Sequence, residues 1–372
     1  DRKDWISLAF VQAGICVCVP AFLLGALLAE AMPIWPAIIS GSLGYLIVVV
    51  GMVATGMIGC DLGLASCTCC QAGFGKSGAR FIVSTIFAVN MIGWFGIQNG
   101  VCGEAFSNAM LAMTGWDIPV VVSNTIWGII MLLTAVYGVH ALEKLDKISI
   151  PLLMIIMCYG IFLAFKVYGT GNLNDEGTVQ SMSFMSGVAL SFNFTAVGTI
   201  TGPDYTRFQK SRKDTVKSVF YGVFPMGVIT LIMGIVLTKL SGQYDISMVL
   251  IEVGLPLLGI IALVISTWTT NSTNAYSAGL NIVMALKLKD NRRREATLIS
   301  GIVGIVLCDL GILGHIEGVL SLLSYVVCPV GGVILADYWV VGKGKAKNFR
   351  PQDGVNWAGV IAWALGAIIS YT

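Results

Sequence analysis

Charge is scarce in this chain. Only 11% of its 372 residues are charged and 56% are hydrophobic, whereas an ordinary soluble domain carries about 25% charged residues. Long polar segments are also lacking, because the longest connections between apolar runs are residues 59–80 and 168–183. The sequence therefore predicts a polytopic membrane protein whose function resides within its helices. A net charge of +2 gives no indication of a nucleic-acid partner.

Histidines and intramembrane acids are equally scarce. The chain has two histidines, His140 and His315, which we expect at opposite membrane faces. Its acids fall near the ends of apolar runs, as Glu104 does, and none lies at a centre. Proton pumps and membrane enzymes usually need such groups at depth. A cation held by carbonyl and hydroxyl oxygens therefore fits better than a proton, and Glu104 keeps the proton alternative open.

The ten cysteines lie mostly within or at the ends of apolar runs. Their positions favour reduced thiols packed as small hydrophobic residues over disulfides. Three of them occur in the run Cys67-Thr68-Cys69-Cys70, shortly before Gly75-Lys76-Ser77. That run resembles the end of a phosphate-binding loop, but the first glycine of the motif would fall at Cys70. We expect a flexible cytoplasmic gate loop there.

Apolar runs of about 20 residues mark membrane crossings. Eleven are predicted, and no cleavable signal peptide is expected before the first. We number them as spans one to eleven in chain order: 5–28, 34–58, 81–103, 118–139, 148–167, 184–202, 217–240, 255–285, 296–314, 318–341 and 355–372.

The basic residues predict the orientation. With the N-terminus in the cytoplasm, all of the 22 Lys and Arg except Lys166 and Lys239 fall in inner segments. An excess of Lys and Arg in cytoplasmic loops is the positive-inside signal. The sequence therefore predicts a multi-pass protein of the cytoplasmic (inner) membrane with a cytoplasmic N-terminus.

Helix breakers recur five spans apart. The first span contains Gly14 and Pro20, and the sixth contains Gly198 and Gly202-Pro203. This symmetry predicts a 5+5 inverted repeat whose first helix in each half is broken at the midplane. We expect one transmembrane domain over 1–372, with repeat 1 at about 5–167, repeat 2 at about 184–341 and an additional helix at 355–372.

The eighth span contains an unusually polar stretch. Nine of the fourteen residues from Ser266 to Gly279 are Ser, Thr or Asn. Unpaired polar groups are costly in a bilayer, so we interpret the stretch as the floor of a binding site. The predicted Na⁺ ligands are backbone carbonyls loosened near Asn271, oxygens of Ser272, Thr273 or Asn274, and carbonyls of Gly14 and Val17 in the first span. Alternatively, the hydroxyls bond to their own helix and the amides bridge helices.

Aromatic and amide side chains follow one face of the third span. Trp94 and Gln98 are four residues apart, with Asn90 one turn earlier. Phe194 and Asn193 precede the break of the sixth span. Two opposed aromatic faces with amides nearby suit a flat, hydrogen-bonding heterocycle. The alternative is a tryptophan and a glutamine that merely pack within the bundle.

Several blocks resemble the nucleobase:cation symporter-1 family, most closely its cytosine permease branch. They are Gly93-Trp94-Phe95-Gly96, Phe194 to Thr201 with Pro203-Asp204-Tyr205-Thr206-Arg207-Phe208, Trp268-Thr269-Thr270-Asn271, and Pro329-Val330-Gly331-Gly332-Val333-Ile334-Leu335-Ala336-Asp337-Tyr338. The resemblance covers essentially the whole chain. It implies an all-α, LeuT-like fold of twelve helices, so a twelfth is expected after Thr372.

The resemblance also implies roles for single residues. Trp94 and Phe194 would sandwich a base, and Gly14, Val17 and Asn271 would offer carbonyls to Na⁺. Cytosine permeases have glutamine where this chain has Met91, whereas hydantoin permeases have one at the position of Gln98. Hydroxyls usual on the eighth helix align with Asn274 and Ala275.

The sequence thus predicts a secondary transporter, not an enzyme, that imports a nucleobase or related heterocycle by cation symport. The predicted substrate residues are Trp94, Phe194, Gln98, Asn193, Met91 and Asn90. Na⁺ is favoured as the coupling ion, and no other cofactor is expected. Proton coupling, or an amino-acid carrier of the same fold, remains the alternative.

Overall fold

The computed structural model describes residues 2–137, 139–170, 173, 182–243 and 246–371. This part of the chain is helical and contains no β-strand beyond one isolated bridge between Lys3 and Gln209. Its α-helices are α1 (Trp5–Cys16), α2 (Val19–Ala31), α3 (Ile34–Leu62), α4 (Ser66–Cys69), α5 (Gln71–Phe74), α6 (Lys76–Gly78), α7 (Ser84–Thr114), α8 (Val120–Tyr137), α9 (Val139–Tyr168), α10 (Phe184–Thr195), α11 (Gly198–Thr206), α12 (Arg212–Ser241), α13 (Ile246–Glu252), α14 (Pro256–Ala285), α15 (Arg293–Asp309), α16 (Ile316–Leu335) and α17 (Trp357–Tyr371). Short π turns, η1 (Ala79–Val83) and η5 (Ala336–Val341), and 3₁₀ turns, η3 (Asp290–Arg292), η4 (Ile312–His315) and η6 (Ala346–Asn348), extend or join them.

Each of the eleven predicted spans contains a helix, although residue 138 of the fourth range and the final residue of the last range, Thr372, lie outside the described residues. Within the described ranges, seven helical segments are long and apolar enough to cross a membrane, or eight when the bent pair α1 and α2 counts as one. The helices of the eighth, ninth and eleventh ranges do not meet that criterion. α15 and α17 are short, at 17 and 15 residues, and α14 carries the polar stretch.

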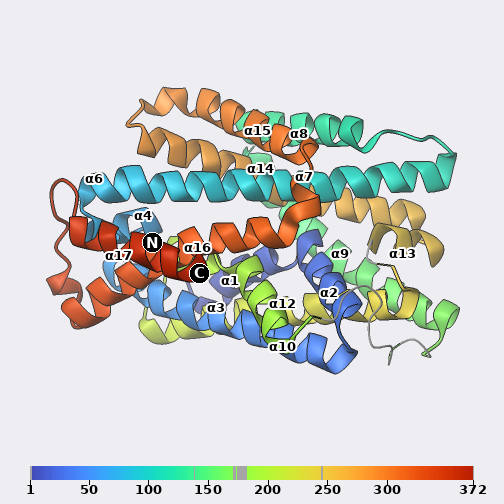
Figure 1. The fold of residues 1–372 in the computed structure, drawn as a ribbon, viewed down its shortest axis with the longest axis horizontal. Coiled ribbons are helices and arrows are strands. Elements are labelled where there is room, and N and C mark those ends of the chain that lie inside the picture. Colours follow the sequence, from blue (N-terminus) through green and yellow to red (C-terminus); the bar gives the residue numbers. More distant parts are fainter. Residues whose placement is uncertain (1, 138, 171–172, 174–181, 244–245, 372) are drawn as a thin grey trace.

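The spans pack as two groups of four. One group is α1 with α2, α3, α10 with α11, and α12; the other is α7, α8, α14 and α15. In Figure 1 the second group occupies the upper half of the molecule and the first group the lower half. Each group unites spans that are five apart in the chain, namely one, two, six and seven, then three, four, eight and nine. This pairing is the one expected of two five-span repeats.

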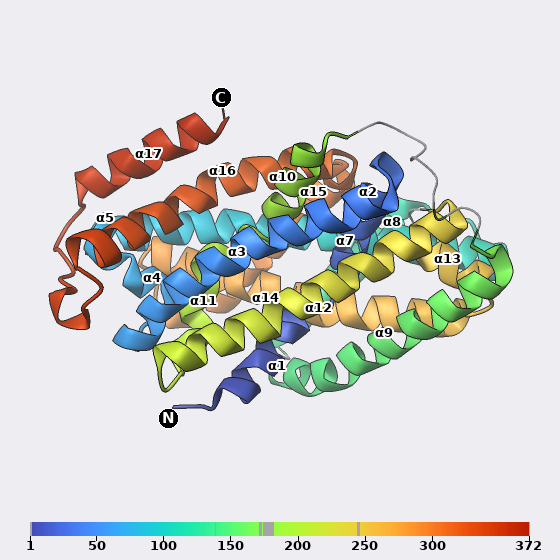
Figure 2. The ribbon, with the colours of Figure 1, turned by 90° about the horizontal axis from the view of Figure 1, so that it is seen from below.

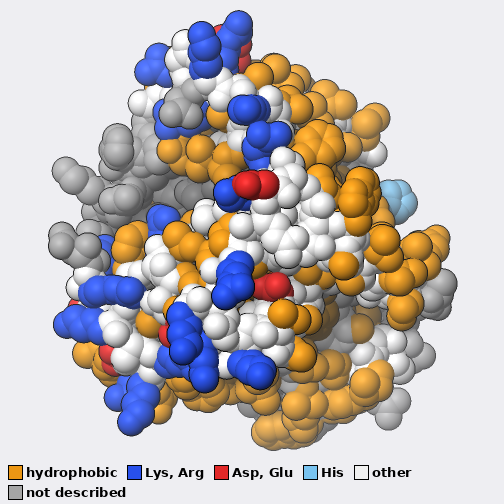
Figure 3. Space-filling model, turned by 90° about the vertical axis from the view of Figure 1, so that its left-hand side faces the viewer, with side chains coloured by type: hydrophobic (Ala, Val, Ile, Leu, Met, Phe, Trp, Pro, Cys, Tyr) orange, Lys and Arg blue, Asp and Glu red, His pale blue; other side chains and the backbone are white. Residues whose placement is uncertain are grey.

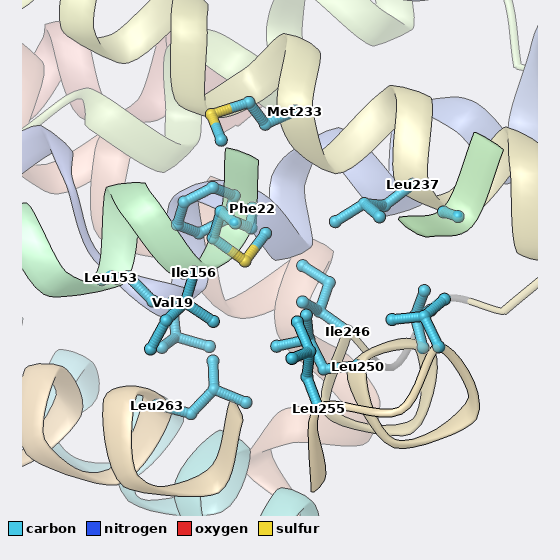
Figure 4. Close-up of a cluster of buried hydrophobic side chains, with 14 of the residues drawn as sticks. Val19, Phe22, Leu153, Ile156, Met233, Leu237, Ile246, Leu250, Leu255 and Leu263 are labelled. Atoms are coloured by element: carbon cyan, nitrogen blue, oxygen red, sulfur yellow. The ribbon is translucent and has the colours of Figure 1, made fainter. Parts of the chain in front are cut away.

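The fifth and tenth spans flank these groups. α9 packs against α12 and α14, and α16 packs against α7 and α10. The eleventh span, α17, lies at the edge of the molecule along α16 (Figure 2). Buried apolar side chains of α2, α9, α12, α13 and α14 form one of the core clusters, shown in Figure 4.

Lysine and arginine side chains gather at the end of the molecule that holds the N-terminus (Figure 3). We call it the basic end. Three spans are tied together there, because Arg212 of α12 forms an ion pair with Asp61 of α3 at 2.5 Å. The hydroxyl of Tyr338 in η5 donates to the same carboxylate at 2.5 Å, and the Arg212 guanidinium lies 5.0 Å from the Trp339 ring. Span ten is thereby anchored to spans two and seven at the basic end.

The cysteine-rich connection is packed rather than open, so the predicted flexible gate loop is wrong in this respect. Cys69, Cys70 and Phe74 are buried in a core cluster with α16. Burial raises the pKa of the Cys69 thiol to about 12. All ten cysteines are free in the structure, and seven of them are buried.

The segment before α17 also contacts the cysteine-rich connection. The backbone N–H of Lys76 donates to the Gln352 carbonyl, and the Lys76 ammonium pairs with Asp353 at 2.7 Å. This pairing lowers the pKa of the Asp353 carboxyl. The segment before α17 thus fastens the loop between spans two and three.

Candidate functional site

Three spans meet around Trp94. Its ring on α7 contacts the ring of Phe194 on α10, with centroids 5.1 Å apart and planes at 82°. The preceding Gly93 lies against Leu323 of α16, where an added Cβ would come within 3.0 Å of that side chain. The predicted substrate residues of spans three and six therefore lie together, and span ten closes the junction. We call this place the α7–α10–α16 junction.

The two aromatic rings touch edge to face in this conformation. A ring stacked between them would need parallel faces and a wider gap. The predicted sandwich therefore requires Trp94 or Phe194 to move before a base can enter. The interruption between α10 and α11, at Ala196 and Val197, follows Phe194 directly. It lies just before the predicted breaker Gly198, which is the first residue of α11, and its backbone remains in the right-handed helical region.

Two buried amide oxygens flank Trp94 without a donor. Asn90 and Gln98 lie four residues before and after it, hence on one stripe of α7, and are 3% and 4% exposed. Asn90 Oδ1 and Gln98 Oε1 have no hydrogen-bond partner among the described residues. Leaving such an acceptor unsatisfied costs about 1–3 kcal/mol. Met91, half-buried beside Asn90, contributes only a thioether.

Asn193 is bound to span ten. Its Nδ2 donates to Ser321 Oγ at 3.0 Å, and its Oδ1 accepts from Ser324 Oγ at 2.6 Å. Asn193 was predicted from the sequence, whereas Ser321 and Ser324 were not. Their spacing of three residues on an otherwise apolar span is the signal that could have indicated a polar face directed at another helix.

The first span is broken between Gly14 and Pro20, as predicted. α1 and α2 meet at an angle of 61°. Val17 and Cys18 leave the helical region there, with ψ angles of 78° and 158°. Pro20 has no N–H to give the Cys16 carbonyl. The Thr230 hydroxyl of α12 lies 3.3 Å from that oxygen and closer, at 2.8 Å, to the Met226 carbonyl of its own helix. The break therefore provides backbone carbonyls that the regular helix bonds do not use.

The polar stretch of the eighth span does not loosen its helix. α14 runs unbroken from Pro256 to Ala285, so the expectation of loosened carbonyls near Asn271 is wrong. Asn271 Nδ2 donates to the Phe95 carbonyl of α7 at 3.1 Å, and Ser272 Oγ donates to the Met131 carbonyl of α8 at 3.0 Å. These two side chains therefore bond to neighbouring helices.

Other groups of the stretch bond within α14 itself. The exposed Thr273 donates to the Thr269 carbonyl at 3.2 Å, and Asn274 Nδ2 lies 3.4 Å from Asn271 Oδ1. Thr269 and Thr270 both donate to the Ser266 carbonyl. The alternative interpretation, with hydroxyls bonded to their own helix and amides bridging helices, thus describes most of the stretch.

A cavity of about 270 Å³ lies between α2, α7, α13, α14, η4 and the start of α16. Glu104 lies on its wall, six residues beyond Gln98 on α7. Val19, Ile246 and Leu263 of its wall belong to the cluster in Figure 4. The cavity is lined by Val19, Leu23, Leu27, Val101, Glu104, Ala105, Ile246, Ser247, Leu263, Leu313, Gly314 and Ile316. Leu23 and Ile316 of its wall share a core cluster with Phe194.

Known proteins share this architecture. Mhp1 in an inward facing conformation matches with a TM-score of 0.85 at 20% identity, over 100% of this chain and 86% of that one. A second match is Mhp1, a nucleobase-cation-symport-1 family transporter, in a closed conformation with bromovinylhydantoin bound. Its TM-score is 0.77 at 18% identity, and the match covers 99% of this chain and 91% of that one. These likenesses confirm the predicted all-α, LeuT-like fold.

Similar sequences indicate the family as well as the fold. The cytosine permease of Escherichia coli (strain K12) is 29% identical over 371 residues, which are 98% of this chain and 85% of that protein. The family described as permeases for cytosine/purines, uracil, thiamine and allantoin matches residues 2–372. The chain therefore belongs to this family of membrane permeases, as its sequence blocks predicted.

Proposed function

We propose that this permease imports a planar nucleobase or related heterocycle, such as cytosine, another pyrimidine, a purine or a hydantoin, by cation symport. The base binds at the α7–α10–α16 junction, stacked on Trp94 and covered by Phe194. The basic end faces the cytoplasm, in keeping with the positive-inside rule. Na⁺ is the proposed coupling ion.

The observation that best supports this proposal is the pair of unpaired amide oxygens of Asn90 and Gln98. Both are acceptors, so a ligand that satisfies them must bring hydrogen-bond donors such as N–H groups. Nucleobases and hydantoins carry such donors on a flat ring, and Trp94 lies between the two oxygens on the same stripe of α7. An apolar ligand would leave both oxygens unsatisfied and would gain nothing from them.

Uptake into proteoliposomes tests the proposal. Cytosine, uracil, adenine and hydantoin are each offered with an inward Na⁺ gradient, with choline in place of Na⁺, and with an inward proton gradient. Saturable uptake of at least one base, driven by Na⁺, is the expected result. Absence of uptake of every base under all three conditions, from protein shown to be folded, would refute the proposed function.

Na⁺ would bind where the first span is broken, near the carbonyls of Gly14 and Val17, with Asn274 of α14 as a side-chain ligand. Replacing Asn274 by alanine should raise the Na⁺ concentration for half-maximal uptake by about 5-fold, since one ligand contributes about 1 kcal/mol. The preference among bases should not change. Na⁺ titration of uptake measures both.

Asn281→Ala is the matched control, because the Asn281 amide donates to the Ser277 carbonyl of its own helix. It should leave the Na⁺ dependence at the wild-type value. A changed base preference in Asn274→Ala, at unchanged Na⁺ dependence, would assign Asn274 to the substrate instead.

Proton coupling is the second candidate, and Glu104 favours it because this carboxyl group lines the cavity. Under that mechanism Glu104→Gln would abolish uptake driven by a proton gradient. Under Na⁺ coupling the variant should retain Na⁺-driven uptake. The two gradients in the proteoliposome assay separate these outcomes.

A further inference from the structure

The two side-chain hydrogen bonds of Asn193 both go to α16. An amide group has two N–H donors and a carbonyl oxygen with two lone pairs. The contacts with Ser321 and Ser324 occupy one donor and one lone pair. One N–H and one lone pair of Asn193 remain for another partner.

The two serines form a fixed support. Ser324 Oγ lies 2.9 Å from the carbonyl oxygens of both Leu320 and Ser321, so its own helix restricts its position. Ser324 is buried at 3% exposure. Because both serines belong to α16, the orientation of the Asn193 amide depends on where span ten lies.

The amide also lies at the proposed site. Asn193 precedes Phe194, whose ring contacts Trp94, and Leu323 of α16 contacts Gly93. The unpaired acceptors of Asn90 and Gln98 occupy the same stretch of α7. A ligand at this junction would therefore meet acceptors from α7 and an amide from α10 that offers both a donor and an acceptor.

We propose that Ser321 and Ser324 are positioning residues that set substrate selectivity through Asn193. By fixing the amide, they select heterocycles that carry an acceptor directly beside an N–H donor, as in a lactam or amidine edge. They also couple the occupant of the site to the position of α16. The inference rests on the proposed function and deepens it.

Equilibrium binding to the purified protein tests it, with cytosine, uracil and hydantoin compared against their N-methylated counterparts. For the parent base that binds wild type most tightly, the Ser321→Ala/Ser324→Ala variant should raise Kd about 10-fold. The Kd of the N-methylated counterpart should stay unchanged, so the discrimination between the two falls. The threonine variants, which keep the hydroxyls, should restore it.

Two controls separate positioning from a structural role. Ser218→Ala removes a buried hydroxyl that lies 3.2 Å from the Thr215 carbonyl of its own helix, and should leave discrimination intact. Thermal unfolding is measured for every variant. If the double variant does not fold, the same discrimination is measured in the single variants Ser321→Ala and Ser324→Ala, each of which retains one serine.

Unchanged discrimination in the serine variants, or an equal loss for parent and N-methylated bases together with lower thermal stability, would overturn the inference while leaving the proposed function standing. Failure of wild type to bind any parent base would overturn the proposed function and this inference with it.

Discussion

Replacing Trp94 by alanine should abolish base binding, raising Kd at least about 100-fold. The substitution removes the apolar surface of the indole ring and its stacking contribution of about 0.5–1.5 kcal/mol beyond burial. It also deprives Phe194 of its edge-to-face partner, at a centroid distance of 5.1 Å. Equilibrium binding of radiolabelled base to the purified variant measures the effect. Trp94→Phe, which keeps a smaller aromatic face, should raise Kd about 10-fold.

Trp127→Ala is the matched control for this prediction. Trp127 also makes edge-to-face contacts, with Phe106 and Trp268, but it lies on α8 and neither ring partner is Phe194. Its replacement should lower thermal stability and leave Kd unchanged. Wild-type affinity in Trp94→Ala would exclude Trp94 from the site.

Gly234→Ala should strongly destabilise the bundle. An added Cβ at Gly234 of α12 would lie 2.2 Å from the Phe22 carbonyl oxygen of α2, and one at Gly25 of α2 would lie 2.4 Å from the Leu231 carbonyl oxygen of α12. Both obstacles are backbone atoms, so the two helices must separate. Overpacking of this kind costs about 1–3 kcal/mol or more. Small residues at such crossings are what allow membrane helices to approach closely.

Thermal unfolding in detergent measures this effect as a midpoint lowered by several degrees. Gly318→Ala on α16 is the control, because an added Cβ there meets no atom within 4 Å. It should be neutral or slightly stabilising, since alanine favours helix over glycine. Equal unfolding midpoints for the two variants would contradict the close packing of α2 and α12.

This crossing bears on the break in the first span. Gly222 of α12 lies against the Ala9 backbone of α1, Thr230 Oγ lies 3.3 Å from the Cys16 carbonyl oxygen, and Gly234 lies against α2. α12 therefore contacts the first span on both sides of its break.

Sequence patterns predicted the spans well because the length of an apolar run reflects the thickness of the bilayer. They also predicted the first break, since a proline without an N–H must interrupt the bonds of a helix. The polar stretch of the eighth span was misinterpreted for a physical reason. Residue type does not reveal whether a hydroxyl such as that of Thr273 bonds its own helix or a ligand, and only the helix neighbours decide this.

The candidate site was predicted in composition but not in geometry. Trp94 and Phe194 do lie together, yet their edge-to-face contact depends on side-chain rotamers and on the conformation of the transporter, neither of which is encoded in residue spacing. Ser321 and Ser324 were overlooked because their importance comes from Asn193, which is more than 120 positions away in the chain.

The central claim is that the face of α7 bearing Trp94 binds a flat heterocycle with N–H donors. Intrinsic tryptophan fluorescence of the purified protein tests it most directly, titrated with cytosine, uracil, adenine, hydantoin and allantoin in Na⁺ and in choline. We expect a saturable change with at least one base, tighter in Na⁺ and shifted to about 10-fold higher concentration in Trp94→Phe. No response to any of the five, from folded protein in either salt, would contradict the claim.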